Sequence, residues 1–177
     1  MSEKGTCCCA GCCEEVLVTP YDEKDMWIAG KIRTQAGIVP VVSTEICFKD
    51  RLGAWKVRWG IGRMNYRVSP GLYAVGTPDE SSPVLVSANY KLTFDLLRKE
   101  LTGLDCWILI LDTKGVNVWC AAGKGTFGTA ELINRIAKTG LSQIVSHRRL
   151  ILPQLGAVGV SAHEVTRQTG FSVLYGP

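Results

Sequence analysis

The sequence has no apolar run of about 18 residues, the length that a membrane-spanning helix needs, and no signal-peptide hydrophobic region at its N-terminus. We therefore expect a soluble, cytoplasmic chain without a membrane segment. An excess of one charge is also absent, because 20 Lys and Arg stand against 16 Asp and Glu, and the net charge of +4 is spread along the chain. This balance argues against a nucleic-acid partner.

Nucleotide-binding and hydrolase signatures are missing too. The Walker pattern needs Gly and then Ser or Thr where Val118 and Gly125 stand. A dinucleotide pattern can be drawn through the glycines after Cys120, but it lies well beyond the strand that it should follow directly. The only two histidines, His147 and His163, lie in no recognisable catalytic signature, so a cysteine hydrolase would lack a clear base.

Cysteine, in contrast, is plentiful. Of the eight cysteines, five cluster near the N-terminus, at Cys7, Cys8, Cys9, Cys12 and Cys13, and the others are Cys47, Cys106 and Cys120. Neighbouring cysteines make a poor disulfide framework because a disulfide needs a defined separation of its two residues. The cluster is therefore interpreted either as ligands for mercury or another soft metal, or as part of an incidental arm.

Strands and helices alternate from Pro83 onward. The patterns predict strands at 84–88, 106–112, 143–146, 150–152 and 171–175, and helices at 92–101, 129–138 and 161–169. This order indicates an α/β fold with a Rossmann-like, mainly parallel sheet and flanking helices. A hairpin over 31–34 and 38–44 predicts a small β-rich N-terminal part. We expect residues 1–25 to form a flexible, cysteine-rich arm and residues 26–177 to form one domain.

Residues 50–68 interleave Trp55, Trp59 and Tyr66 with several Lys and Arg residues. Such a pattern binds nucleic acid or anions in some proteins. The favoured interpretation is structural, with packed aromatic rings and basic side chains that extend along them to solvent.

Cys120 lies where an α/β sheet places its ligands. The apolar run 106–111 predicts a strand buried on both faces, and Cys120 follows it near the start of a predicted helix. Ligands bind where the strands of open α/β sheets end, and a helix N-terminus favours a thiolate. Cys120 is thus a candidate metal ligand or nucleophile, although from spacing alone a buried structural cysteine is somewhat favoured.

Residues 117–129, N-V-W-C-A-A-G-K-G-T-F-G-T, resemble the cap-helix motif of the HgcA family, the corrinoid proteins of bacterial mercury methylation. The resemblance extends over about residues 45–177, through 50–66, 70–76, 88–95, 146–157 and 170–177. The chain is more distantly similar to the large subunit of the corrinoid iron–sulfur protein of acetyl-CoA synthesis, which has no cysteine at the position of Cys120.

The resemblance implies a corrinoid-binding domain that holds cobalamin or a related corrinoid above a short cap helix. In that family the cap-helix thiolate, here Cys120, is the catalytic residue and the lower ligand of cobalt. The absence of a D-x-H-x-x-G signature supports a base-off corrinoid. The implied activity is that of a corrinoid-dependent methyltransferase forming methylmercury from Hg(II), by carbanion or radical transfer. Alternatives are a methyl carrier for another acceptor, as in acetyl-CoA synthesis, and a non-catalytic corrinoid or metal-binding module.

Further site residues follow from the same resemblance. Asn117 is expected to fix the turn before the cap helix, Trp119 to pack the helix onto the sheet, and Ala121, Ala122 and Gly123 to let its backbone approach the macrocycle. Other expected cofactor contacts are Asn89, Tyr90, Val118, Lys124, Thr126, His147, Gln154, Leu155, Gly156 and Ala157. For His147, a capped strand end is an equal alternative.

The implied partners are Hg(II), a methyltransferase that donates the methyl group, and a ferredoxin-like iron–sulfur protein. In the HgcA family that protein is HgcB, a reductant and a candidate mercury donor. The family is tethered to the inner membrane through a C-terminal region that this sequence does not contain.

Overall fold

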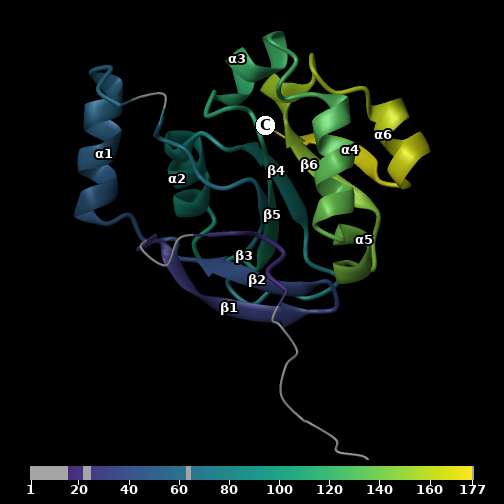
Figure 1. The fold of residues 1–177 in the computed structure, drawn as a ribbon. Coiled ribbons are helices and arrows are strands. Elements are labelled where there is room, and N and C mark those ends of the chain that lie inside the picture. The colour runs from purple at the N-terminus through teal and green to yellow at the C-terminus, as the bar shows by residue number, and fades with distance from the viewer. Residues whose placement is uncertain (1–15, 22–24, 63–64, 177) are drawn as a thin grey trace, which may run out of the picture.

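The computed structural model describes residues 16–21, 25–62 and 65–176 (Figure 1). The strands are β1 (Ile28–Thr34), β2 (Gly37–Val42), β3 (Gly71–Val75), β4 (Val84–Ala88), β5 (Cys106–Leu111), β6 (Arg149–Pro153) and β7 (Ser172–Gly176). The helices are α1 (Phe48–Arg58), α2 (Lys91–Glu100), α3 (Val118–Gly123), α4 (Thr129–Lys138), α5 (Leu141–Ile144) and α6 (Ala162–Thr169), with a 3₁₀ helix, η2 (Gln154–Gly156). No helix among these residues is long and apolar enough to cross a membrane.

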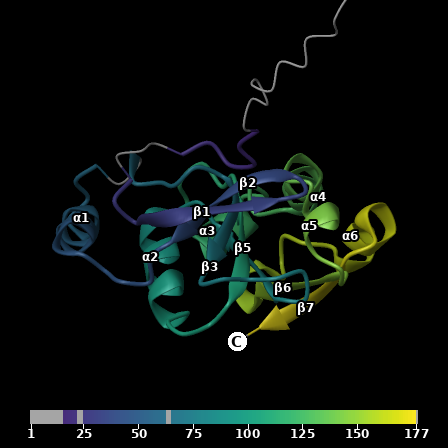
Figure 2. The same ribbon diagram turned by 90° about the horizontal axis from the view of Figure 1, so that it is seen from below.

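The described strands form one sheet of seven, in the order β1-β2-β3-β5-β4-β6-β7. Four of the six neighbouring pairs are parallel, and the antiparallel ones are β1–β2 and β3–β5. Helix α2 covers one face, while α4, α5 and α6 cover the other (Figures 1 and 2). The prediction of a Rossmann-like, mainly parallel α/β fold is confirmed, although the N-terminal hairpin joins the main sheet through the β2–β3 pair.

Strand β5 holds the two faces together. Trp107, Leu109 and Leu111 pack in the cluster under α4 and α5, whereas Cys106, Ile108 and Ile110 pack in the cluster under α2. Successive side chains of a strand point to opposite faces, so an uninterrupted apolar run is what a strand buried on both faces requires. The prediction for this strand is confirmed.

Part of the stretch expected to be a flexible arm lies against the sheet instead. Thr19 is fully buried, and its hydroxyl donates to the carbonyl of Leu72 and accepts from its N–H, both at 2.7 Å. Val18 donates to the carbonyl of Ile38 at 2.9 Å. This stretch thus bonds to both β2, through Ile38, and β3, through Leu72. The Cys7–Cys13 cluster lies outside the described residues, and the division into arm and domain otherwise remains a prediction.

Two other elements differ from the sequence expectation. Residues 141–144 form the short helix α5, so the predicted strand 143–146 is wrong. Its apolar content, Ile144 and Val145, is too short a run for periodicity to separate helix from strand. Strand β3 carries no alternation because all five of its residues are buried, and no strand was predicted there.

The carboxyl ends of β4 and β5 form the switch point of the sheet. The chain leaves β4 toward α2 on one face and leaves β5 toward α4 on the other (Figure 1). In open α/β sheets, the crevice between two such strands is where ligands bind. Helix α3, which carries Cys120, lies at this edge.

Candidate functional site

The crevice at the switch point is spanned by the side chain of Asn89. Its Oδ1 accepts hydrogen bonds from the Thr113 N–H (3.1 Å), the Thr113 hydroxyl (2.8 Å) and the Gly115 N–H (2.9 Å). Its Nδ2 donates to Asp112 at 3.2 Å. Asn89 is only 2% exposed, and its bonds tie the loop after β4 to the loop after β5.

The turn after β5 is held in an unusual conformation. Lys114 is the only described non-glycine residue with positive φ (60°), and its Nζ pairs with Asp112. Burial raises the pKa of the Asp112 carboxyl, but the hydrogen bonds and charge of Lys114 outweigh it, so the pKa lies below its ordinary value. The turn is therefore fixed both by Asn89 and by this ion pair before the chain enters α3.

Helix α3 begins at an asparagine cap. Asn117 has extended backbone geometry, and its Oδ1 accepts from the Cys120 N–H at 2.9 Å. Asparagine is among the best residues for this position because its side chain satisfies a helix N–H that has no carbonyl partner. The expectation that Asn117 fixes the turn is consistent with this bond, which also sets the position of the Cys120 backbone.

The residues of α3 divide between two faces. Val118, Ala121 and Ala122 are buried and belong to the main hydrophobic core. Trp119 is 70% exposed, Gly123 is exposed and Cys120 is half-buried, so these three face outward. The expectation that Trp119 packs the helix onto the sheet is wrong, because the smaller Val118, Ala121 and Ala122 fill that role. The two alanines let α3 approach the protein's own core.

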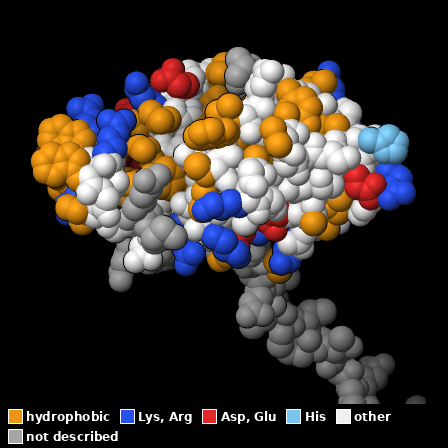
Figure 3. All heavy atoms as spheres, turned by 90° about the horizontal axis from the view of Figure 1, so that it is seen from above, with side chains coloured by type: hydrophobic (Ala, Val, Ile, Leu, Met, Phe, Trp, Pro, Cys, Tyr) orange, Lys and Arg blue, Asp and Glu red, His pale blue; other side chains and the backbone are white. Residues whose placement is uncertain are grey.

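The segment after β6 packs beside α3. A Cβ on Gly159 would lie 2.1 Å from the Phe127 carbonyl oxygen and 3.2 Å from the Cα of Ala122, and a Cβ on Gly156 would lie 2.5 Å from the Phe127 ring. These glycines permit an approach that no other residue allows. The segment exposes Leu155 (61%) and Val158 (88%). Figure 3 shows this face from above, with hydrophobic side chains exposed over its middle.

The other residues expected to contact the cofactor differ in their exposure. Gln154, Leu155 and Ala157 are exposed, and Gly156 is buried, all at the carboxyl edge near α3. Lys124 is exposed after the end of α3, and the Thr126 hydroxyl donates to the carbonyl of Ala121 at 3.4 Å. Tyr90 is 7% exposed and caps α2. Its aromatic ring is thus mostly inside the protein.

His147 is not brought to this site. It precedes β6 and lies at the amino-terminal edge of the parallel strands, where its Nε2 is 2.9 Å from the carbonyl oxygen of Ser82. Its Nδ1 accepts from the Arg149 N–H at 3.2 Å. The expectation of a rim position depended on the incorrect strand at 143–146, and the alternative role at a strand end describes the contacts better.

The remaining described cysteines have structural surroundings. Cys106 is 2% exposed, and burial together with the charge of Asp105 raises the pKa of its thiol to about 11. Cys47 caps α1, where its thiol lies 3.2 Å from Asp50. Within the described ranges, no group of three or more His, Cys, Asp or Glu side chains is arranged to hold a metal ion. Cys120 is thus the described thiol that faces outward at the switch-point edge.

Sequence reasoning missed two parts of this site. It predicted that Asn89 lies at the rim of a cofactor site, whereas the Asn89 amide forms hydrogen bonds with the loop at 112–115. It also missed Val158 and Gly159, which lie in a segment without regular structure. The glycine pair at 156 and 159 was the available signal, because glycines near a strand end often mark a close backbone approach.

Fold and site together define an α/β domain with an outward thiol on a short helix above its switch point. A family model described as CO dehydrogenase/acetyl-CoA synthase delta subunit, CdhD, matches residues 61–177, and the chain belongs to this family. The gamma subunit of the acetyl-CoA decarbonylase/synthase complex of Methanopyrus kandleri is 37% identical over 111 residues, which cover 62% of this chain and 24% of that protein. The same subunit of Archaeoglobus fulgidus is 34% identical over 117 residues, covering 65% and 24%.

The corresponding gamma subunit of Methanocaldococcus jannaschii is 36% identical over 111 residues, covering 62% of this chain and 22% of that protein. The chain therefore spans about a quarter of the length of these curated relatives. The family is similar to corrinoid proteins in general, and the matches do not single out the HgcA family within that group.

Proposed function

We propose that this chain is a corrinoid-binding methyl-transfer domain in which the sulfur of Cys120 is the lower ligand of cobalt. One observation carries the proposal: the half-buried Cys120 shares the outward face of α3 with the exposed Trp119, at the switch-point edge of the sheet. Membership of the CdhD family supports the same class of function.

The residues around Cys120 fit a broad, flat macrocycle with polar side arms. A Cβ added at Gly123 would meet no atom within 4 Å, so the surface beside the thiol is open. Trp119, Leu155 and Val158 offer exposed apolar area. Lys124 and Gln154 are exposed nearby and suit the amide groups of a corrin. A thiolate is also a soft ligand that suits a transition metal.

The proposal gives Cys120, Asn117 and Asn89 separate roles. A bound corrinoid supplies a cobalt centre that accepts and releases a methyl group. The Cys120 thiolate donates electron density to the metal, as a cysteine ligand does to haem iron. Asn117 holds the first turn of α3, and Asn89 holds the loop that precedes it, so the sulfur keeps one direction.

A methyl carrier for acetyl-CoA synthesis is the better supported activity. The relatives are named as gamma subunits of an acetyl-CoA decarbonylase/synthase complex, so the chain would pass its methyl group to another subunit of such a complex. The domain would then serve as a carrier, with the acceptor chemistry on its partner.

Transfer to Hg(II) is a second candidate that Cys120 itself favours. With a corrinoid bound, the Cys120 thiolate would supply electron density to the metal, and this would favour a soft electrophile as the methyl acceptor. The HgcA-like residues 117–129 carry this candidate. It requires an external reductant such as a ferredoxin-like iron–sulfur protein.

Addition of methylcobalamin to the purified chain tests the proposal. We expect bound cobalamin with a visible spectrum that changes in Cys120→Ala but not in Cys47→Ala, a control that removes a thiol outside the site. Product assays then separate the acceptors: acetyl-CoA from CO, coenzyme A and an acetyl-CoA synthase, or methylmercury from Hg(II) and a reduced ferredoxin. A chain that binds no cobalamin would contradict the proposal.

A further inference from the structure

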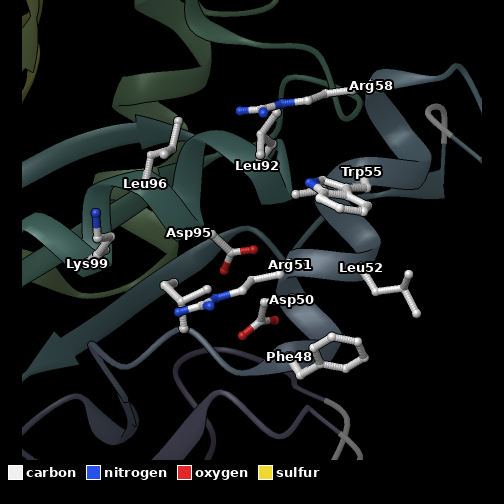
Figure 4. Close-up of a pocket in the computed structure, with 12 residues that line it drawn as sticks. Phe48, Asp50, Arg51, Leu52, Trp55, Arg58, Leu92, Asp95, Leu96 and Lys99 are labelled. Carbon is white, nitrogen blue, oxygen red and sulfur yellow. The ribbon is translucent and has the colours of Figure 1, made fainter.

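A groove of about 510 Å³ lies between α1 and α2, away from Cys120 (Figure 4). Its walls come from both helices and from the chain just before α1. The lining residues used here are Phe48, Trp55, Ala54, Leu92 and Leu96, together with the basic residues Arg51, Arg58 and Lys99. Helix α1 ends at Arg58, before the segment matched by the family model, so the groove is not a feature of the matched residues alone.

Helix α1 stands beside the body of the protein (Figures 1 and 2). It exposes large apolar side chains. Phe48 is 79% exposed, Trp55 is 70% exposed and Trp59 is 86% exposed. These residues recur at helical spacing along one side of α1. Exposed apolar side chains that gather in this way mark an interaction site. The expectation that the aromatic residues of this segment pack inside is wrong for Trp55 and Trp59.

Helix α2 packs Phe94 and Leu97 in the core and turns two other leucines toward the groove. Lys91, Asp95 and Arg98 are buried, whereas Leu96 is 54% exposed. Leu92 and Leu96 lie one helical turn apart and both line the groove. Helix α2 therefore presents an apolar stripe that the described protein leaves uncovered.

Buried ion pairs hold the two helices at a fixed separation. Asp50 of α1 contacts Arg98 Nη2 at 2.7 Å and Lys91 Nζ at 3.1 Å. The Arg98 side chain also donates to the carbonyls of Ser43 and Glu45 at 2.5 and 2.7 Å. These bonds fix the base of the groove, so a ligand meets walls that are already in place.

The accessible charge around the groove is positive. Asp50 and Asp95 line it but pair with Lys91 and Arg98. Arg51 and Arg58 line the groove (Figure 4) and are exposed. Among the ion pairs of the described residues, neither is paired with a carboxylate. Lys99 is exposed and meets only the exposed Glu100, at 3.5 Å. A ligand with carboxylates beside apolar groups would complement this surface.

We propose that the α1–α2 groove binds an acidic amphipathic segment of a partner protein. Its aliphatic side chains pack against Leu92, Leu96 and Trp55, and its carboxylates meet Arg51 and Arg58. This is the helix-in-groove mode of recognition. A flat bilayer would touch Trp59 but could not enter between the helices, and an oligonucleotide would gain little from the leucines.

Two matched peptides test the proposal on the full chain by fluorescence anisotropy. Both are labelled 14-residue helices with leucine at the same positions, one with glutamate and one with lysine at the polar positions. We expect the glutamate peptide to bind at least tenfold more tightly than the lysine peptide. Leu96→Asp should weaken it at least tenfold, and Arg51→Glu with Arg58→Glu should reverse the preference.

The double variant Lys138→Glu with Arg149→Glu, which changes the net charge equally outside the groove, is the control and should bind as the wild type does. Circular dichroism melting verifies that each variant folds. No binding of the glutamate peptide, or equal binding of both peptides, would overturn the proposal. So would tighter binding, through the same residues, of phosphatidylglycerol vesicles or of a single-stranded oligonucleotide. A dimer in light scattering that Leu96→Asp abolishes would also overturn it.

Discussion

The side-chain oxygen of Asn117 accepts a hydrogen bond from the backbone N–H of Cys120 at 2.9 Å. This bond joins the residue that starts α3 to the residue that we propose as the cobalt ligand. Because α3 has only six residues, its first turn depends on this cap more than a longer helix would. The position of the sulfur is thereby coupled to the side chain of Asn117.

Asn117→Ala should weaken both the helix and the cofactor site. Loss of an asparagine cap costs about 1 kcal/mol. We expect a small decrease in the free energy of unfolding and a larger decrease in cobalamin affinity, measured by titration of the visible spectrum. Asn117→Ser, which keeps an oxygen at the cap, should restore most of the affinity. If Asn117→Ala binds cobalamin like the wild type, the cap has no positioning role.

Asn89→Ala should destabilise the fold through the loop at 112–115. The change leaves the Gly115 N–H without its acceptor, and a buried unsatisfied group costs about 1–3 kcal/mol, whereas the Thr113 hydroxyl keeps its bond to the Val116 carbonyl. Urea unfolding provides the measurement. The control is Asn134→Ala, since Asn134 is an exposed residue with one hydrogen bond to Glu131. Equal stability of the two variants would contradict the assigned role of Asn89.

A pair of glycine variants separates packing from cofactor binding. Gly159→Ala places a Cβ 2.1 Å from the Phe127 carbonyl oxygen, so we expect a clear decrease in thermal stability. Gly123→Leu meets no protein atom near the new Cβ and should melt like the wild type. If the corrinoid covers Gly123, the leucine variant should bind cobalamin at least tenfold more weakly. Wild-type affinity in that variant would place the cofactor elsewhere.

Arg98→Ala should be among the most destabilising substitutions in the chain. Arg98 is fully buried and bonds to Asp50, Asp95 and two backbone carbonyls. Removing one partner of a buried ion pair costs about 3–5 kcal/mol because the other charges remain buried without compensation. Arg167→Ala, which breaks an exposed pair with Glu164, is the control and should change the unfolding midpoint little.

Stability should fall at acid pH partly through Asp50. Burial raises the pKa of this carboxyl, but Lys91, the Cys47 hydrogen bond and Arg98 outweigh that effect and hold the pKa below its ordinary value of 3.8. Because the folded-state pKa is lower than the unfolded one, this contribution is fully present above about pH 4–5 and is lost as the pH falls through the folded-state pKa. Asp50→Asn should be less stable at pH 7 and should lose less stability on acidification.

The elements with a strong local sequence pattern were the most predictable part of this molecule. Residues 106–111 form a strand with no polar interruption, and the capping box at Ser161 and Glu164 marks α6, where Ser161 accepts from the Glu164 N–H. The role of Asn117 at the turn before α3 was expected from the family resemblance, and the Cys120 N–H bonds to its side chain. For the strand and for α6, the local pattern and the tertiary structure favour the same conformation.

The rest depended on long-range contacts that local patterns do not contain. Thr19 is buried through a bond to Leu72, which lies 53 residues away. His147 was expected at the wrong edge of the sheet because a two-residue apolar patch was interpreted as a strand. Leu92 and Leu96 have the spacing of a core-facing stripe, but Phe94 fills the core from another side of α2, so these leucines face the groove.

Cobalt X-ray absorption of the cobalamin-loaded chain tests the central claim most directly. The account predicts a sulfur scatterer in the first coordination shell of cobalt, present in the wild type and in Cys47→Ala, and absent in Cys120→Ala. A first shell with only nitrogen and oxygen in the wild type, or a sulfur scatterer that persists in Cys120→Ala, would contradict the assignment of Cys120 as the lower ligand.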